Sequence, residues 1–351
     1  MIRKNIAVVY LLKIKVVAFI FFFTALFSFS KIHAQDIHFS QFYASPLNLN
    51  PALTGVIEGN YRAAAIYRNQ WGSISDNPYI TVGGSFDLNL PLDKLKDVVG
   101  MGINFVNDKA GKGSLGMMNL SLAVAYHKRL DKAGKHFLGL GIQPGIIQRS
   151  LNTNKLLFPS QYNGNDFDQS RPSGENFGNN TIRYFDLNSG LLYSGKVSKR
   201  VGVMQGISVY HLTKPKESFL NEDVRLANRF TVHGGLRIKL NEVFYLTPNY
   251  IYQFQNKAQE INFGSAIEFH LKGKQETTIL SVGGWYRLND APIASASVEY
   301  KKLRAGVSYD FTTSDLKPAA NITGGFELTL IYTGIFVKQD AGPMLVPCPR
   351  L

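Results

Sequence analysis

Three glycines give the chain a formal phosphate-loop motif. Gly111, Gly113 and Gly116 fit the pattern G-x-G-x-x-G, in which backbone N–H groups can cradle a phosphate. That chemistry requires a strand before the motif and a helix after it. Here a loop precedes the glycines, and a stretch of alternating apolar and polar residues follows. We therefore predict a flexible hairpin loop.

Three histidines and one serine are the other residues that could carry metal or nucleophilic chemistry. His127, His233 and His270 fall on the polar faces of three separate stretches, and a zinc site would need them to converge. A lipid-cleaving site would need a serine beside a histidine. Ser121 and His127 share a face but lie six residues apart on one strand, beyond hydrogen-bond reach. We expect polar residues facing the interior of a sheet, with no catalytic site, cofactor or metal.

A long acidic loop could instead hold calcium. Asp166, Asp168 and Glu175 lie among asparagines and glycines, which are the residues that calcium loops use. Their spacing does not match an EF-hand loop, so we expect a solvated loop.

The elements that must position these residues are strands. From Met118 to His127 apolar residues alternate strictly with small or polar ones, and the same pattern recurs along the chain. About 14 stretches have the length of roughly 9–11 residues or slightly more that a tilted membrane strand needs. The expected strands are 60–71, 79–90, 98–107, 116–128, 136–149, 181–195, 201–212, 227–239, 243–254, 259–271, 276–288, 292–300, 303–312 and 319–331.

The connections between these stretches alternate in length. Those after even-numbered strands are short, whereas the two longest, 150–180 and 213–226, both follow odd-numbered strands. Long outer loops and short periplasmic turns are typical of an outer-membrane barrel. A soluble sandwich would also alternate, but the strand number and this asymmetry favour an all-β, transmembrane antiparallel β-barrel.

The N-terminus and the composition agree with export. Residues 1–34 combine a basic start, an apolar run and a small-residue end, which is the layout of a secretory signal peptide. Removing the five basic residues of this segment from the formal charge of +13 leaves +8. Such a charge suits lipopolysaccharide or acidic partners. Because the basic residues are scattered, we do not expect nucleic acid as a partner. The single cysteine, Cys348, excludes an internal disulfide.

Four blocks resemble a known family. They are Gln35–Gly55 (with FSQ and N-P-A-x-x-G), Tyr67–Pro91 (with R-x-Q-W), Ser308–Tyr332, and the ending VPCPRL. Together they resemble the PorP/SprF family of outer-membrane proteins, which is associated with type IX secretion and gliding motility in Bacteroidetes.

The resemblance implies a membrane barrel that is not an enzyme. It would support secretion or surface attachment of a cognate cell-surface protein such as an adhesin, and contact the periplasmic ring components of the type IX system, with outer-membrane lipid and lipopolysaccharide around it. A passive channel is the main alternative, and Arg229, Arg237 and Lys239 would make it prefer anions. An outer-membrane lipid hydrolase is a third possibility.

The expected organisation has four parts: a signal peptide (1–34), a periplasmic segment or plug (35–59), the barrel (60–331) and a periplasmic tail (332–351). The family offers no defined set of functional residues, so candidate partner-binding residues come from the physical pattern. On the periplasmic side they are Phe39, Gln41, Tyr43, Asn50, Pro51, Gly55, Cys348, Pro349 and Arg350. In the long outer loop they are Tyr162, Asp166, Asp168, Arg171 and Phe177.

Overall fold

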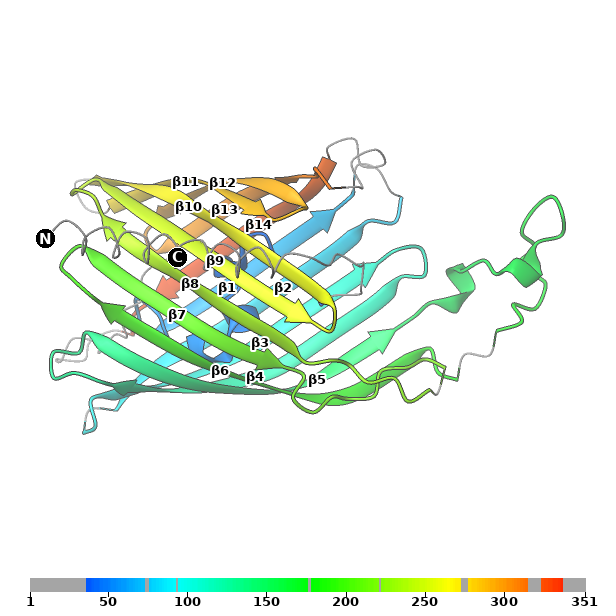
Figure 1. The fold of residues 1–351 in the computed structure, drawn as a ribbon, viewed down its shortest axis with the longest axis horizontal. Helices are drawn as coiled ribbons and strands as arrows, with labels where there is room; N and C mark the ends of the chain where they lie inside the picture. Colours follow the sequence, from blue (N-terminus) through cyan, green and yellow to red (C-terminus); the bar gives the residue numbers. More distant parts are fainter. Residues whose placement is uncertain are drawn as a thin grey trace, which may run out of the picture. The chain divides into compact units, whose positions relative to one another are not determined.

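The chain folds into a closed antiparallel barrel. The computed structural model describes residues 36–72, 76–92, 94–175, 178–220, 222–272, 277–314 and 323–336. In these ranges fourteen strands each pair with their sequence neighbours, and β1 pairs with β14 to close the ring (Figure 1). The predicted fold class and strand number are confirmed. None of the helices in the described ranges is long and apolar enough to cross a membrane.

The strands begin and end close to the expected positions. They are β1 (Tyr61–Gln70), β2 (Tyr79–Leu92), β3 (Asp97–Ala110), β4 (Leu115–Arg129), β5 (His136–Ser150), β6 (Thr181–Lys196), β7 (Val201–Tyr210), β8 (Arg229–Lys239), β9 (Phe244–Gln255), β10 (Ala258–Lys272), β11 (Thr277–Arg287), β12 (Ala291–Tyr300), β13 (Leu303–Phe311) and β14 (Thr323–Gly334).

Two strand ends and one pairing irregularity have identifiable local causes. β7 ends two residues early because His211 takes a left-handed backbone conformation, with φ of 61°. β14 continues to Gly334, because Gly334 pairs with Tyr61 at the seam. Pro144 lies inside β5, and the β4–β5 pairing is interrupted around it, as expected for a residue without an N–H group.

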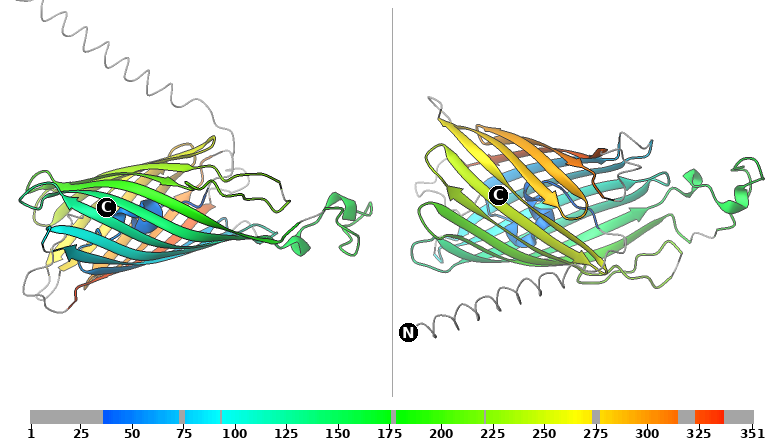
Figure 2. Two further views of the ribbon diagram at one scale, coloured as in Figure 1. Left: turned by 90° about the horizontal axis from the view of Figure 1, so that it is seen from below. Right: turned by 45° about the horizontal axis from the view of Figure 1, so that its top comes forward.

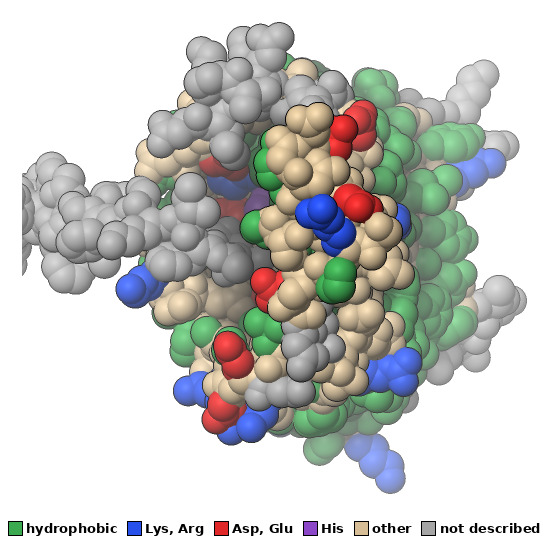
Figure 3. All heavy atoms as spheres, turned by 90° about the vertical axis from the view of Figure 1, so that its right-hand side faces the viewer, with side chains coloured by type: hydrophobic (Ala, Val, Ile, Leu, Met, Phe, Trp, Pro, Cys, Tyr) green, Lys and Arg blue, Asp and Glu red, His purple; other side chains and the backbone are tan. Residues whose placement is uncertain are grey.

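The two faces of the barrel wall differ in polarity. Outward side chains are large and apolar, and many stay exposed, including Leu122, Ile146 and Val282 at about 60%. Inward side chains are mostly polar, and Figure 3 shows hydrophobic side chains over the outer wall. In the alternating sequence pattern, the apolar residues thus face outward and the polar residues face inward.

The two ends of the barrel differ in their connections. We call the end that carries the connections after odd-numbered strands the long-loop end, and the opposite end the short-turn end. The β5–β6 connection holds η3 (Thr153–Lys155) and η4 (Pro159–Gln161) and projects well beyond the strands (Figure 1).

The interior is filled by the segment before β1. Residues 36–60, here called the plug, form η1 (Phe42–Ala44), α2 (Pro46–Leu49) and η2 (Pro51–Leu53) inside the ring of strands (Figure 2). Plug residues pack against inward apolar side chains of the wall to form the main hydrophobic core. This core contains Phe42, Leu49, Ala52, Leu53, Val56, Val98, Phe137, Leu192, Met204, Ile251, Ala266, Trp285 and Ile293.

Candidate functional site

The plug runs along the lumen from one end of the barrel to the other. Asp36 contacts His211, which directly follows β7 at the long-loop end. Further along, Thr54 contacts His127 near the short-turn end of β4. The plug is therefore anchored to the wall along its whole length, and its anchors are the candidate functional site.

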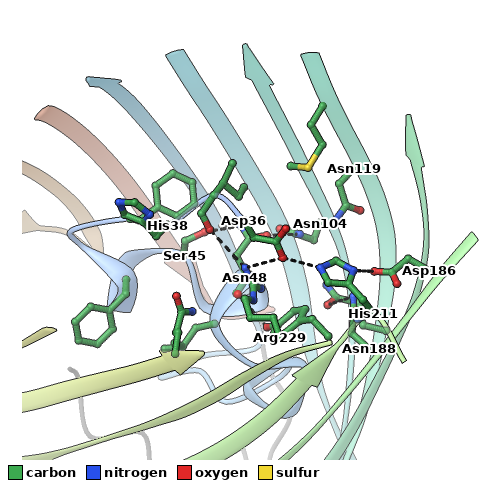
Figure 4. Close-up of a pocket in the computed structure, with 18 of the residues that line it drawn as sticks. Asp36, His38, Ser45, Asn48, Asn104, Asn119, Asp186, Asn188, His211 and Arg229 are labelled. Atoms are coloured by element: carbon green, nitrogen blue, oxygen red, sulfur yellow. Dashed lines mark hydrogen bonds and ion pairs between the residues drawn. The ribbon is translucent and has the colours of Figure 1, made fainter. Parts of the chain in front are cut away.

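The first anchor is a buried histidine between two carboxylates, and we call it the histidine anchor. His211 Nε2 lies 2.6 Å from Asp36 Oδ2, and its Nδ1 lies 3.0 Å from Asp186 Oδ2. Arg229 Nη1 approaches the same Asp36 oxygen at 3.5 Å. Figure 4 shows Asp36, His211 and Asp186 in one line across the recess.

The charges of the histidine anchor stabilise each other. Burial alone would lower the pKa of His211, but the carboxylates of Asp36 and Asp186 outweigh it and raise that pKa to about 9. Burial would likewise raise the pKa of Asp36, yet the charges of His211 and Arg229 hold it well below its usual value. The imidazolium and the carboxylate thus hold the start of the plug as an ion pair at neutral pH.

The second anchor is an ionic cluster that we call the central network: Ser40, Arg68, Arg287, Asp310 and Glu327. Glu327 accepts hydrogen bonds from the backbone N–H groups of Ser40 at 2.7 Å and Gln41 at 2.8 Å. Arg68 lies 3.0 Å from Asp310 and 2.5 Å from Glu327, while Arg287 lies 2.6 Å from Asp310. Two cations and two anions balance inside the lumen, as buried charges require.

Ser40 is not placed to act as a nucleophile. Its hydroxyl donates to Asp310 at 2.7 Å and accepts hydrogen bonds from Arg68 and Arg287. A nucleophilic serine needs a base able to take its proton, whereas this carboxylate is committed to two guanidinium groups. The central network therefore fixes the backbone of the plug.

The N-P-A-x-x-G block packs directly on the barrel wall. The Asn50 amide donates to Leu191 O at 3.0 Å and lies 3.0 Å from His233 Nε2. A side chain at the wall residue Gly141 would collide with the backbone of Pro51 and Ala52. This block thus lies so close to the wall that its backbone leaves no room for a side chain at the facing wall glycine.

The end of the same block makes a tight turn against β3. Gly55 has φ of 79°, and a Cβ there would lie 2.6 Å from Gly100 Cα. Its N–H donates to Asp87 Oδ2 at 2.8 Å, and Asp87 also pairs with Arg62 at 2.8 Å. Only glycine satisfies both the left-handed backbone and the contact.

Aromatic packing holds the middle of the plug. Tyr43 stacks on Trp285 with ring centroids 5.3 Å apart, and the Trp285 indole donates to Asn249 at 2.7 Å. Burial raises the pKa of Tyr43 to about 12. This phenol therefore stays neutral and acts as a packing residue.

Two of the cavities beside the plug are small. The one toward the long-loop end holds about 50 Å³ and is lined by residues that include Asp36, His38, Asn48, Asn104 and His211 (Figure 4). The other holds about 100 Å³ beside Leu53, Val56 and Arg62. Spaces of this size hold a few water molecules, so neither fits a lipid or a hydrocarbon chain. Figure 3 shows charged and histidine side chains at the floor of the recess at the long-loop end.

The structure brings the N-terminal residues singled out in the sequence together inside the lumen. Those that are buried or half-buried there are Phe39, Gln41, Tyr43, Asn50, Pro51 and Gly55. Each contacts the wall or the plug, and Gln41, for example, donates to Ser308 at 3.1 Å. Their role in docking a periplasmic partner stays a prediction. Cys348, Pro349 and Arg350 lie outside the described residues.

The candidates in the long loop lie far along the β5–β6 connection. Tyr162 is 48% exposed and packs on Phe167, with ring centroids 5.3 Å apart. Asp168 pairs with Arg171 at 3.7 Å, and Asp166 is exposed. Phe177 lies outside the described residues. These four described residues form a solvated surface, and their partner-binding role also stays a prediction.

The residues considered for chemistry do not converge. His127 donates to Thr54 O, His233 contacts Asn50, and His270 contacts Glu268. In the part of the chain that the structure describes, no group of three His, Cys, Asp or Glu residues could hold a metal ion. Gly111 and Gly113 lie in the turn between β3 and β4, as the sequence predicted.

The sequence did not single out the main wall residues that hold the plug. Arg68 and Asp310 stood in the resembling blocks without a role, while His211, Arg287 and Trp285 carried no distinguishing pattern. One signal was present, because Phe137, Ile251 and Trp285 are large and apolar on faces otherwise polar. Inward apolar side chains of this kind indicate a lumen that is packed against something.

Comparison with known proteins places this geometry in context. A family model described as the type IX secretion system membrane protein PorP/SprF matches residues 32–332. Among curated protein sequences, none matches the chain significantly.

Several solved outer-membrane barrels have a similar fold. A FadL homologue from Pseudomonas aeruginosa is 10% identical, with a TM-score of 0.48, covering 81% of this chain and 92% of that one. The toluene transporter TodX from P. putida is 12% identical, with a TM-score of 0.44 and coverage of 80% and 90%. CdiB from Acinetobacter baumannii is 11% identical, with a TM-score of 0.41 and coverage of 78% and 60%. The likeness concerns the fold alone.

Proposed function

This chain belongs to the PorP/SprF family of type IX secretion system membrane proteins, and we propose that it supports secretion or surface attachment of a cognate cell-surface protein such as an adhesin. Its fold is that of an outer-membrane barrel. Export through the signal sequence of residues 1–34, with its removal, is part of the proposal.

The observation that carries the proposal is the filled lumen. The plug is bonded to the wall from Asp36 to Gly55, and two cavities beside it hold about 50 and 100 Å³, while a wider one of about 690 Å³ lies at the short-turn end. A polypeptide cannot pass through the two small cavities. The barrel therefore acts through its two ends, by positioning partners.

The two ends suit different partners. The β5–β6 connection carries exposed Tyr162 and Phe167 beyond the barrel, and we assign this outer surface to the secreted protein. The short-turn end faces the periplasm in this orientation, where the ring components of the type IX system are the proposed partners. Outer-membrane lipid and lipopolysaccharide would contact the apolar outer wall.

The geometry does not favour the alternative of an anion-preferring channel. Each of the three cations that would attract anions already has an acidic partner: Arg229 lies 3.5 Å from Asp36, Arg237 lies 3.0 Å from Glu268, and Lys239 lies 2.7 Å from Glu242. A lipid hydrolase is not favoured either, because Ser121 and His127 remain on one strand and Ser40 is held by charged partners. We propose that this protein is not an enzyme.

Deletion of the gene tests the proposal. Surface proteins would be labelled on intact cells with a membrane-impermeant biotin reagent and quantified by mass spectrometry, with complementation by the wild-type gene as control. We expect one or a few large secreted proteins to disappear from the surface and to return on complementation. Normal surface levels of every secreted adhesin would overturn the proposal. Steady conductance of the purified protein in planar bilayers would instead favour the channel.

A further inference from the structure

A cavity at the short-turn end is lined mainly by basic side chains. It holds about 690 Å³, within the range of roughly 300–1,000 Å³ found for ligand pockets. Among the described residues of the lining, Glu58 is the single acidic one. We call its basic residues the basic vestibule: Lys135, Lys196, Lys199, Arg200, Arg237 and Lys239.

The backbone holds these like charges side by side. The N–H of Lys196 donates to Lys135 O at 2.9 Å, and the N–H of Lys239 donates to Arg200 O at 2.7 Å. Like charges at neighbouring positions of a sheet destabilise it. In the described part of the chain, no carboxylate lies within ion-pair distance of Lys135, Lys196, Lys199 or Arg200, and all four are exposed. At these four positions the fold concentrates positive charge without an ion pair to a described residue, whereas Arg237 and Lys239 of the vestibule pair with Glu268 and Glu242.

Some basic residues of the long-loop end pair with carboxylates. Lys216 lies 3.1 Å from Asp223, Arg149 lies 2.6 Å from Glu217, and Arg171 pairs with Asp168. Exposed Lys112, Lys214 and Lys257 at that end have no carboxylate at ion-pair distance among the described residues, but they lie on three separate connections. The vestibule differs because it gathers six basic residues around one cavity.

Part of the vestibule faces the lumen mouth. Lys196 follows the buried Leu192 and Ser194 on the inward face of β6, and Lys239 shares the inward face of β8 with the buried His233. Val197, which also lines the cavity, and the neighbouring Leu240 are exposed apolar side chains at 65% and 51%. A lipid headgroup with its chains along the outer wall would not reach the lumen side. The lumen-side residues are therefore reached from the aqueous side.

We infer that the basic vestibule docks an acidic peptide segment of a periplasmic protein. This inference rests on the proposed function, because it gives the chemistry of the partner at the periplasmic end. Carboxylates presented along an extended peptide would pair with Lys196, Lys199 and Arg200, and complementary charge would also speed association.

Binding of a synthetic acidic peptide tests the inference. Fluorescein-labelled hexaglutamate would be titrated against the full-length protein in non-ionic detergent and followed by fluorescence anisotropy, with hexaglutamine as the uncharged probe. The test variant carries Lys196→Gln, Lys199→Gln and Arg200→Gln, which are exposed positions. The matched control removes the same charge at exposed positions of the long-loop end, Lys112→Gln, Lys214→Gln and Lys257→Gln.

We expect the wild type to bind hexaglutamate and not hexaglutamine, with affinity falling as salt rises. The test variant should bind at least about tenfold more weakly and the control within about twofold of the wild type. Equal weakening in both variants would overturn the inference, because net charge alone would then explain binding. Displacement by 10 mM inorganic phosphate or by phosphatidylglycerol nanodiscs would also overturn it, in favour of a free anion or a lipid headgroup. If gene deletion removes a surface protein but the wild type binds no hexaglutamate, the inference fails and the proposed function stands.

Discussion

Replacing Glu327 by glutamine should release the plug without changing its shape. Glu327 is fully buried and neutralises Arg68 while accepting two backbone N–H groups of the plug. Glutamine keeps the volume but removes the charge, and its NH₂ group places a donor against a donor. One positive charge of the central network is then left without compensation.

The magnitude follows from the cost of an unpaired buried charge. Removing one partner of a buried ion pair typically costs about 3–5 kcal/mol. Since about 1.4 kcal/mol corresponds to a factor of ten, the ratio of seated to released plug should fall by roughly two to three and a half orders of magnitude. Arg68 keeps Asp310 as a partner, which places the expected effect near the lower limit.

Single-channel recording in planar bilayers measures this ratio. A barrel of fourteen strands without its plug encloses a water-filled path, so each release appears as a conductance step. We expect the wild type to be silent and Glu327→Gln to open frequently. The control is Asp223→Asn, which breaks the exposed Lys216–Asp223 pair and should leave the record unchanged. Equal silence in Glu327→Gln and wild type would refute the claim that this network holds the plug.

Three further predictions concern pH, packing and the outer wall. The pKa of His211 is raised from 6.5 to about 9, so its ion pair stabilises the plug fully below pH 6.5 and is lost as pH rises through 9. Hydrogen exchange at the start of the plug, corrected for intrinsic exchange, should therefore increase between pH 6.5 and 9.5, and His211→Gln should lack this increase. The same increase in the wild type and the variant would contradict the role of the His211 ion pair. Gly141→Ala should destabilise the folded barrel by about 1–3 kcal/mol because the added methyl group meets the plug backbone. Gly284→Ala should leave the stability unchanged, because the nearest atom to its added methyl group lies at 3.9 Å. The midpoint temperatures of heat-induced gel shifts measure both effects. Leu122→Arg on the outer wall should lower the free energy of unfolding in lipid vesicles by about 2–4 kcal/mol, and Leu240→Arg at the short-turn end by about 0–1 kcal/mol. Equal urea midpoints for the two variants would argue against the membrane placement.

The charge pattern of the interior follows from the same physics as the plug. Inward carboxylates and guanidinium groups are tolerable only when paired, since an isolated buried charge is too costly. The central network meets this condition within the lumen, whereas Lys135, Lys196, Lys199 and Arg200 of the basic vestibule are exposed and remain charged without an ion-pair partner in the described chain. The first therefore fixes structure, and the second is available for a partner.

The sequence alone was sufficient to predict the barrel. Alternation has a period of two residues and depends only on which solvent each face meets, so it can be recognised within each strand. The fourteen strands and the asymmetry of their connections follow from that local pattern. Even Pro144, which interrupts the pairing of β4 with β5, did not obscure it.

The lumen could not be predicted in the same way, because a polar inward face suits water, a plug or a ligand equally well. Ser40 meets Glu327 across 287 positions and Asp36 meets His211 across 175, and no periodicity relates such residues. Inward apolar side chains such as Phe137 and Trp285 indicate that something packs there, but not what. Local solvent preference thus fixed the wall of this protein, whereas the path of residues 36–60 and the partners of each buried charge were decided only when the strands closed around them.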